Sequence, residues 1–113
     1  MAENIDDLTI AFYEDGRNVV KQIEKRVLTK GNWATIMYKF QDLNKKTGEY
    51  MPCKATIRRY QKRNGIYRQQ SKFNVSSGKQ AREISAILLE WFPEGATEEA
   101  QPPPEEQTAQ SDD

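Results

Sequence analysis

The sequence has no histidine and only one cysteine, Cys53, in 113 residues. A single cysteine cannot form an internal disulfide, which fits a reducing compartment, and the common histidine and cysteine ligand sets for zinc are missing. Hydrolases that depend on a histidine base are excluded for the same reason. The strand-like surroundings of Cys53 predict a small core residue rather than a reactive thiol.

Long hydrophobic runs and clustered carboxylates are missing too. No stretch approaches the ~20 apolar residues that span a bilayer, and the acidic start does not resemble a signal peptide. We therefore expect no membrane partner, and a place in the cytoplasm of a bacterial or phage-infected cell or in a eukaryotic nucleus. The carboxylates of the central region, Asp42, Glu49, Glu83 and Glu90, are scattered and do not suit a catalytic metal. The sequence thus predicts no enzyme, no catalytic residue, no metal and no cofactor.

The net charge is zero, yet the two signs are separated along the chain. Residues 1–16 carry five acids and residues 94–113 carry seven, and neither range has a base. Residues 17–92 hold all seventeen bases and five acids, a net charge of +12. We therefore divide the chain into an acidic N-terminal extension (1–16), a basic domain (17–92) and an acidic tail (93–113). A basic domain of this kind is typical of proteins that bind polyanions.

The tail has no aromatic or large aliphatic residue, so it is predicted to be disordered. Two roles are open for it. It is either a solubilising extension, or a mobile polyanion that competes with nucleic acid for the basic surface or recruits a replication or transcription protein.

The stretch SSGKQAREISAILLEWF (76–92) predicts a helix. Ser76 or Ser77 can cap its N-terminus, and Pro93 ends it. Its apolar residues recur at helical spacing and are Ala81, Ile84, Leu88 and Trp91, widened by Ile87, Leu89 and Phe92. A helix this apolar on a small domain is expected to pack on a sheet and on a second copy of itself. Ile84, Leu88 and Trp91 are therefore the expected dimer interface.

Upstream, apolar residues alternate, which predicts strands over 32–40, 50–60 and 66–75. Asn64-Gly65 predicts a two-residue hairpin turn, and NKKTG (44–48) a longer one. The stretch 17–28 suits a helix or a strand, and its β-branched residues favour a strand. Leu8, Ile10 and Phe12 alternate as well and suit an extra strand. The expected fold is α+β, with a four-stranded antiparallel sheet, or a five-stranded one with the extra strand, followed by one C-terminal helix.

Alternation divides the predicted sheet into two faces. The face that the helix is expected to cover carries Ile36, Tyr38, Phe40, Ala55, Ile57, Phe73 and Val75. The opposite face then displays Lys39, Lys54, Arg58, Tyr60, Arg68 and Lys72, with Lys62 and Arg63 at a turn on its edge. Cations neutralise phosphates and aromatic rings stack on unpaired bases, so such a face suits single-stranded nucleic acid. The alternative is a solvated face that is merely rich in lysine and arginine.

Residues 20–92 resemble the transcriptional coactivator family called positive cofactor four, including its bacterial and phage relatives. TIRRY (56–60) is similar to the Ile-Arg-x-aromatic strand of that family, and SKFNVSS (71–77) is similar to its Lys-Gly-Ile-x-Leu-Ser entry to the helix. Trp33 lies near an early-strand tryptophan of the bacterial members. The resemblance implies a homodimer whose helices pack together and whose sheets form channels for single-stranded DNA. It also implies that Arg58 contacts the DNA backbone, that Tyr60 stacks on a base and that Lys72 is the basic residue ahead of the helix.

We therefore expect a dimeric single-stranded DNA-binding protein that acts in replication, recombination or transcription. The candidate nucleic-acid-binding residues are Arg58, Tyr60, Lys72, Lys54, Arg68, Lys39, Lys62, Arg63, Trp33 and Phe40. Two alternatives remain open. One is a protein-interaction adaptor that uses the apolar helix and the acidic tail, and the other is an RNA-binding protein.

Overall fold

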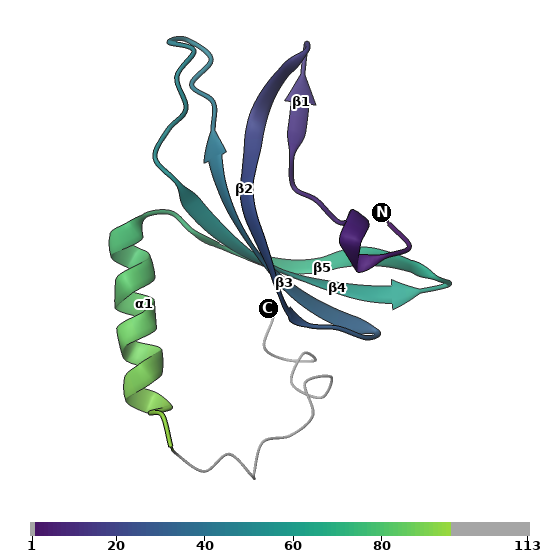
Figure 1. The fold of residues 1–113 in the computed structure, drawn as a ribbon, viewed down its shortest axis with the longest axis vertical. Coiled ribbons are helices and arrows are strands. Elements are labelled where there is room, and N and C mark those ends of the chain that lie inside the picture. The colour runs from purple at the N-terminus through teal and green to yellow at the C-terminus, as the bar shows by residue number, and fades with distance from the viewer. Residues whose placement is uncertain (1, 96–113) are drawn as a thin grey trace.

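The fold is a curled antiparallel sheet followed by one α-helix, as described for residues 2–95 in a computed structural model (Figure 1). The elements are a short 3-10 helix, η1 (Ile5–Asp7), the strands β1 (Phe12–Glu14), β2 (Arg17–Thr29), β3 (Trp33–Asp42), β4 (Lys54–Arg63) and β5 (Ile66–Val75), and the helix α1 (Gly78–Trp91). Strands that follow one another in sequence are neighbours in the sheet, and every pair is antiparallel. The predicted α+β class, with a fifth N-terminal strand, is confirmed. Of the predicted disordered tail, residues 96–113 lie outside the described residues.

Two tight turns have the conformation that their sequences predict. Asn64 and Gly65 join β4 to β5 with φ angles of 53° and 79°. Asp15 and Gly16 join β1 to β2 with the same pair of angles. Positive φ at both central residues matches the right-handed twist of the strands, and Asn-Gly and Asp-Gly tolerate it best. These turns therefore fix the pairing of the strands on either side of them.

The connection between β3 and β4 is longer and holds Cys53. Asn44 organises it by accepting from the Gly48 amide at 2.7 Å through its backbone carbonyl. Cys53 lies just before β4 and is exposed, so the prediction of a core residue is wrong. The reason is that β4 begins at Lys54, four residues later than the predicted strand 50–60, so Cys53 belongs to the loop.

β2 carries two irregularities that curl the sheet. Its register against β3 shifts between Gln22 and Glu24 and again between Val27 and Thr29. Each shift leaves one extra residue, Ile23 or Leu28, in β2, and such bulges bend a strand and increase its twist. Figure 1 shows the result, with the N-terminal segment on one side of the curled sheet and α1 leaving on the other.

The core lies between the sheet and the chain that precedes β1. Leu8 and Ile10, predicted as part of an extra strand, precede β1 and are buried. They pack in one cluster with the buried sheet residues Ala34, Ile36, Tyr38, Tyr60 and Tyr67. The N-terminal segment, which we define as residues 2–11, therefore supplies the second layer of the core.

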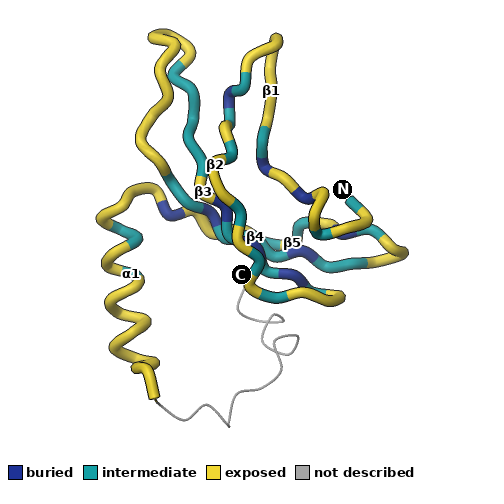
Figure 2. Tube along the Cα trace, in the orientation of Figure 1, coloured by how far each residue is buried: buried dark blue, intermediate teal, exposed yellow. Residues whose placement is uncertain are grey.

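α1 begins as predicted but does not cover the sheet. Ser77 is the N-cap, and its hydroxyl accepts from the Gln80 amide at 3.1 Å. The Gln80 side chain in turn accepts from the Ser76 amide at 2.9 Å, which completes a reciprocal cap. No residue of α1 is buried, so the prediction that the helix packs on its own sheet is wrong (Figure 2). Of the face it was expected to cover, Ile36 and Tyr38 pack with Leu8 and Ile10, whereas Phe73 is 52% exposed.

Candidate nucleic-acid interface

The pairing of β3 with β4 decides which candidate residues share a face. Residues directly opposite each other in an antiparallel pair point to the same side of the sheet. Arg58 lies opposite Ile36, and Tyr60 lies opposite Ala34. Arg58 and Tyr60 are therefore on the same face as Ile36, and the prediction that separated them is wrong.

The physical reason is that alternation shows which residues of one strand share a side. It does not show how neighbouring strands are aligned, and that alignment decides which sides form one face. The sequence pattern correctly grouped Lys54, Arg58 and Tyr60 on one side of β4. It did not show which side of β3 they join, because the loop 43–53 is too long to set the register. A change of one residue in register exchanges the two faces of a whole strand.

We call the face that holds the core the Tyr60 face. Six of the ten candidate binding residues lie on it, as strand parity and pairing show: Phe40, Lys54, Arg58, Tyr60, Lys62 and Lys72. The other four lie on the opposite side, which we call the Met37 face: Trp33, Lys39, Arg63 and Arg68. Arg68 and Lys72, predicted on one face, are separated because the β4–β5 register shifts between Arg59 and Tyr60 and leaves Gln70 as an extra residue of β5. The ten residues therefore do not form one surface.

Arg58 is the best-positioned cation of the Tyr60 face. It lies opposite Lys72 on β5, so two positive charges are side by side across the strands. Its Nη1 donates to Gln69 Oε1 at 3.0 Å. Its Nε donates to Thr56 Oγ1 at 3.4 Å. Among residues 2–95, no carboxylate forms an ion pair with Arg58 or Lys72. Neutral groups hold the guanidinium in place while its charge stays available for an anion.

Lys54 and Phe40 extend this charged row toward the end of the sheet near the β3–β4 loop. They lie opposite each other on β4 and β3, and both are partly exposed. Lys54 Nζ contacts Asp42 Oδ2 at 3.0 Å, and both side chains of the pair are more than one third exposed. Exposed pairs of this kind contribute about 0–1 kcal/mol. A phosphate can therefore replace Asp42 as the partner of Lys54 at little cost.

Tyr60 does not offer its ring to solvent. Its side chain is 2% exposed, and its hydroxyl lies 3.0 Å from the hydroxyl of Tyr38. Burial raises the pKa of Tyr38 far above its usual value, and the hydrogen bond to Tyr60 raises that pKa further. The base stacking expected of Tyr60 is not possible in this arrangement, because Leu8 and Ile10 pack in the same cluster.

Lys62 lies at the far end of the same face. Its Nζ is 5.2 Å from the centre of the Tyr67 ring, a cation–π distance. The Tyr67 hydroxyl donates to the Gly31 carbonyl at 2.6 Å, which ties β5 to the β2–β3 turn. Lys62 is thus placed by an aromatic ring rather than by an acid.

Three groups that the sequence pattern did not single out also shape this face. Lys25 on β2 points to it, opposite Tyr38, and Gln69 and Asn74 on β5 orient Arg58 and Thr56. Alternation along 66–75 is the signal that would have found Asn74. The bulges of β2 hid Lys25, because they break the period of two on both sides of it.

The Met37 face is apolar at its centre and basic at its edges. Met37 and Ile57 lie opposite each other, and Phe73 beside them is 52% exposed. At one edge, the Arg59 guanidinium lies 5.0 Å from the centre of the Trp33 ring. This face suits an apolar partner better than a polyanion.

Within residues 2–95, no group of three histidine, cysteine or acidic side chains is arranged to hold a metal ion. No helix in the same range is long and apolar enough to cross a membrane.

Comparisons with family models, with curated proteins and with solved structures found no protein that matches this chain.

Proposed function

We propose that this chain is a single-stranded DNA-binding protein whose contact surface is the exposed part of the Tyr60 face. The observation that carries the proposal is the row formed by Lys54, Arg58 and Lys72 beside Phe40, in which Arg58 and Lys72 have no carboxylate partner among the described residues. The charge of +12 in residues 17–92 and the resemblance to the positive cofactor four family support it. The protein acts in replication, recombination or transcription and performs no chemistry of its own.

The row suits a single strand better than a duplex. Lys54 and Arg58 are four residues apart on β4, about 13 Å at the rise of a strand, so they reach different phosphates of an extended backbone. Phe40 lies opposite Lys54 and is partly exposed, and unpaired bases stack on aromatic rings. In a duplex the faces of the bases are already stacked on one another.

We propose that the active form is a homodimer assembled through α1. Along this helix Leu88, Trp91 and Phe92 are 47%, 67% and 56% exposed. Ile84 is partly exposed on the same element. Apolar side chains this exposed mark an interaction surface, and the family resemblance favours a second copy as the partner. The apolar centre of the Met37 face offers the same partner additional area.

The experiment compares two charge-matched double variants in binding to labelled oligonucleotides. Arg58→Ala with Lys72→Ala removes two cations from the Tyr60 face, and Lys39→Ala with Arg68→Ala removes two from the Met37 face. Fluorescence anisotropy is measured with single-stranded DNA, matched duplex and matched RNA at several salt concentrations. We expect the first variant to weaken single-strand binding and to reduce the slope of log K against log salt by about 1.4, since each lost phosphate contact removes about 0.7. The second is expected to change the slope little.

Equal effects of the two variants would show that the charge acts without a defined face, and would overturn the proposed surface. Absence of binding to all three nucleic acids at low salt would overturn the nucleic-acid function itself. The exposed apolar residues of α1 would then favour the protein-interaction adaptor. RNA binding tighter than DNA binding would keep the surface and change its ligand.

A further inference from the structure

The N-terminal segment crosses the Tyr60 face from one edge of the sheet toward the other. Ala2 forms an antiparallel bridge with Tyr67 on β5, where the Tyr67 amide donates to the Ala2 carbonyl at 2.8 Å. Ile10, eight residues later, donates its amide to Oε1 of Gln22 on β2 at 3.0 Å. The segment therefore lies over the middle of the face that is proposed to bind DNA.

The segment binds one cation of this face, Lys25, through two hydrogen bonds. Lys25 Nζ donates to the carbonyl oxygens of Ile5 at 2.6 Å and Leu8 at 2.8 Å. The lysine ammonium group only donates hydrogen bonds, so these two carbonyl oxygens stand where phosphate oxygens could accept from it. The contact resembles the one that a nucleic-acid backbone would make with the same ammonium group.

Aromatic rings of the face are covered by the same segment. Leu8 and Ile10 are 3% and 9% exposed, and they pack in one cluster with Tyr38, Tyr60 and Tyr67. The three tyrosines are buried as a result, so none of them presents a ring to a base. The part of the face that stays accessible is the row formed by Lys54, Arg58 and Lys72 beside Phe40.

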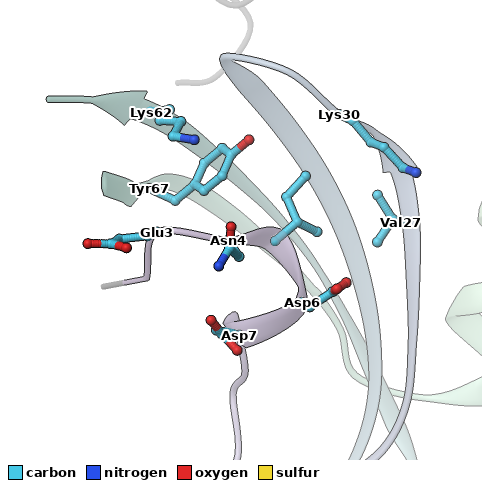
Figure 3. A pocket seen from close by; sticks show the side chains of 9 residues that line it. Glu3, Asn4, Asp6, Asp7, Val27, Lys30, Lys62 and Tyr67 are labelled. Atoms are coloured by element: carbon cyan, nitrogen blue, oxygen red, sulfur yellow. The ribbon is translucent and has the colours of Figure 1, made fainter. Parts of the chain in front are cut away.

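The acids of the segment lie near cations without pairing to them. Glu3, Asp6 and Asp7 line an open cavity of about 680 Å³ together with Lys30 and Lys62 (Figure 3). Among residues 2–95, none of the three acids forms an ion pair. They place negative charge over the basic face, yet no direct contact makes them necessary for the fold.

We propose that the N-terminal segment is a displaceable strap that competes with single-stranded DNA for the Tyr60 face. This inference rests on the proposed function and adds its regulation. Displacement of the segment frees Lys25 and uncovers Tyr60 and Tyr67, so the bound strand gains a longer path. It also removes three acids from the neighbourhood of the phosphates.

Local opening of this segment is physically reasonable. It contains only a three-residue 3-10 helix, and Leu8 and Ile10 are its buried side chains. Segments held by few buried groups open more often than the rest of a fold. Because the uncovered state is a minor one, the apparent affinity for DNA is lowered by the fraction of molecules that are open.

The first test uses the unmodified protein with oligothymidylate and follows amide hydrogen exchange. The Ile10 amide, which is bonded to Gln22 across the two layers, is expected to exchange faster when DNA is bound. Slower exchange at Ile10 on DNA binding would show that the segment stays in place, and would overturn the proposal. No mutation is needed, so folding does not limit this measurement.

The second test compares variants of equal charge change. The triple variant Glu3→Gln, Asp6→Asn, Asp7→Asn removes the acids of the segment. The control Glu49→Gln, Glu83→Gln, Glu90→Gln removes three acids elsewhere. We expect the first to bind oligothymidylate about tenfold more tightly at low salt, and the control to show a much smaller gain, because screened charges act mainly at short range. Equal gains would overturn the proposal.

A third variant separates this inference from the proposed function. Leu8→Ala loosens the segment and leaves Arg58 and Lys72 in place, so DNA binding is expected to tighten by about three- to tenfold. If Arg58→Ala with Lys72→Ala weakens binding but Leu8→Ala does not tighten it, the strap is overturned and the DNA-binding surface stands. If the Arg58 and Lys72 variant has no effect, the proposed binding surface fails, and the strap, which competes for that surface, fails with it.

Discussion

The hydroxyl groups of Tyr38 and Tyr60 form an isolated buried pair, and removing one of them is expected to cost more than removing both. The two oxygens are 3.0 Å apart, and the side chains are 1% and 2% exposed. Tyr60→Phe leaves the Tyr38 hydroxyl buried without this partner, which costs about 1–3 kcal/mol of the free energy of unfolding. Tyr38→Phe leaves the Tyr60 hydroxyl in the same position. The double variant removes both polar groups and is expected to be within about 1 kcal/mol of the unmodified protein.

The assay is urea unfolding followed by far-ultraviolet circular dichroism at one fixed protein concentration, because a dimer gains stability with concentration. The control is Tyr50→Phe, whose exposed hydroxyl donates to the Asn18 carbonyl at 2.8 Å and whose loss is expected to cost about 0.5 kcal/mol or less. Additive costs in the double variant would refute the reasoning, because they would mean that each hydroxyl is satisfied independently of the other. The result matters for function as well, since this pair lies beneath the N-terminal segment.

Two further predictions concern pH and assembly. Because the pKa of Tyr38 is raised in the folded state, its contribution to stability is present below about pH 10, the usual pKa of tyrosine, and is lost as the pH rises above that value. Melting temperatures measured between neutral pH and the alkaline range are therefore expected to fall less for the Tyr38→Phe, Tyr60→Phe variant, and a parallel fall would contradict this. Leu88→Glu is expected to halve the mass seen by light scattering, whereas Ala86→Glu, on the opposite side of the same helix, leaves it unchanged. A dimer that survives Leu88→Glu would rule out α1 as the interface.

Local sequence signals predicted the elements of this fold well. The two-residue turn at Asn64-Gly65 was identified because positive φ at both positions restricts the residue types that occur there. α1 was identified from a capping serine at Ser77 and from helical spacing. The stretch 17–28 was ambiguous for a physical reason, since the bulges at Ile23 and Leu28 interrupt the alternation that marks a strand.

The candidate site was only partly predictable because it depends on contacts between distant segments. Parity within β4 correctly placed Arg58 with Tyr60, but no sequence signal fixed the register of β4 on β3 across the loop 43–53. The burial of Tyr60 could not be predicted from the sequence either. It results from Leu8, which lies far away in sequence and reaches the face through the curl of the sheet.

The bulges of β2 also determine how this chain tolerates changes in its length. Gln22 and Glu24 lie opposite successive residues of β3, so Ile23 is an insertion between two correctly alternating positions. Loss of Ile23 by deletion would keep every other side chain on its present face and would remove only an exposed residue. A deletion at a regular position of β3 or β4 would instead exchange the faces of the rest of that strand. The bulges are thus places where evolution can shorten the strand and adjust the curvature of the sheet, and with it the fit of the N-terminal segment, without reassigning a single functional side chain.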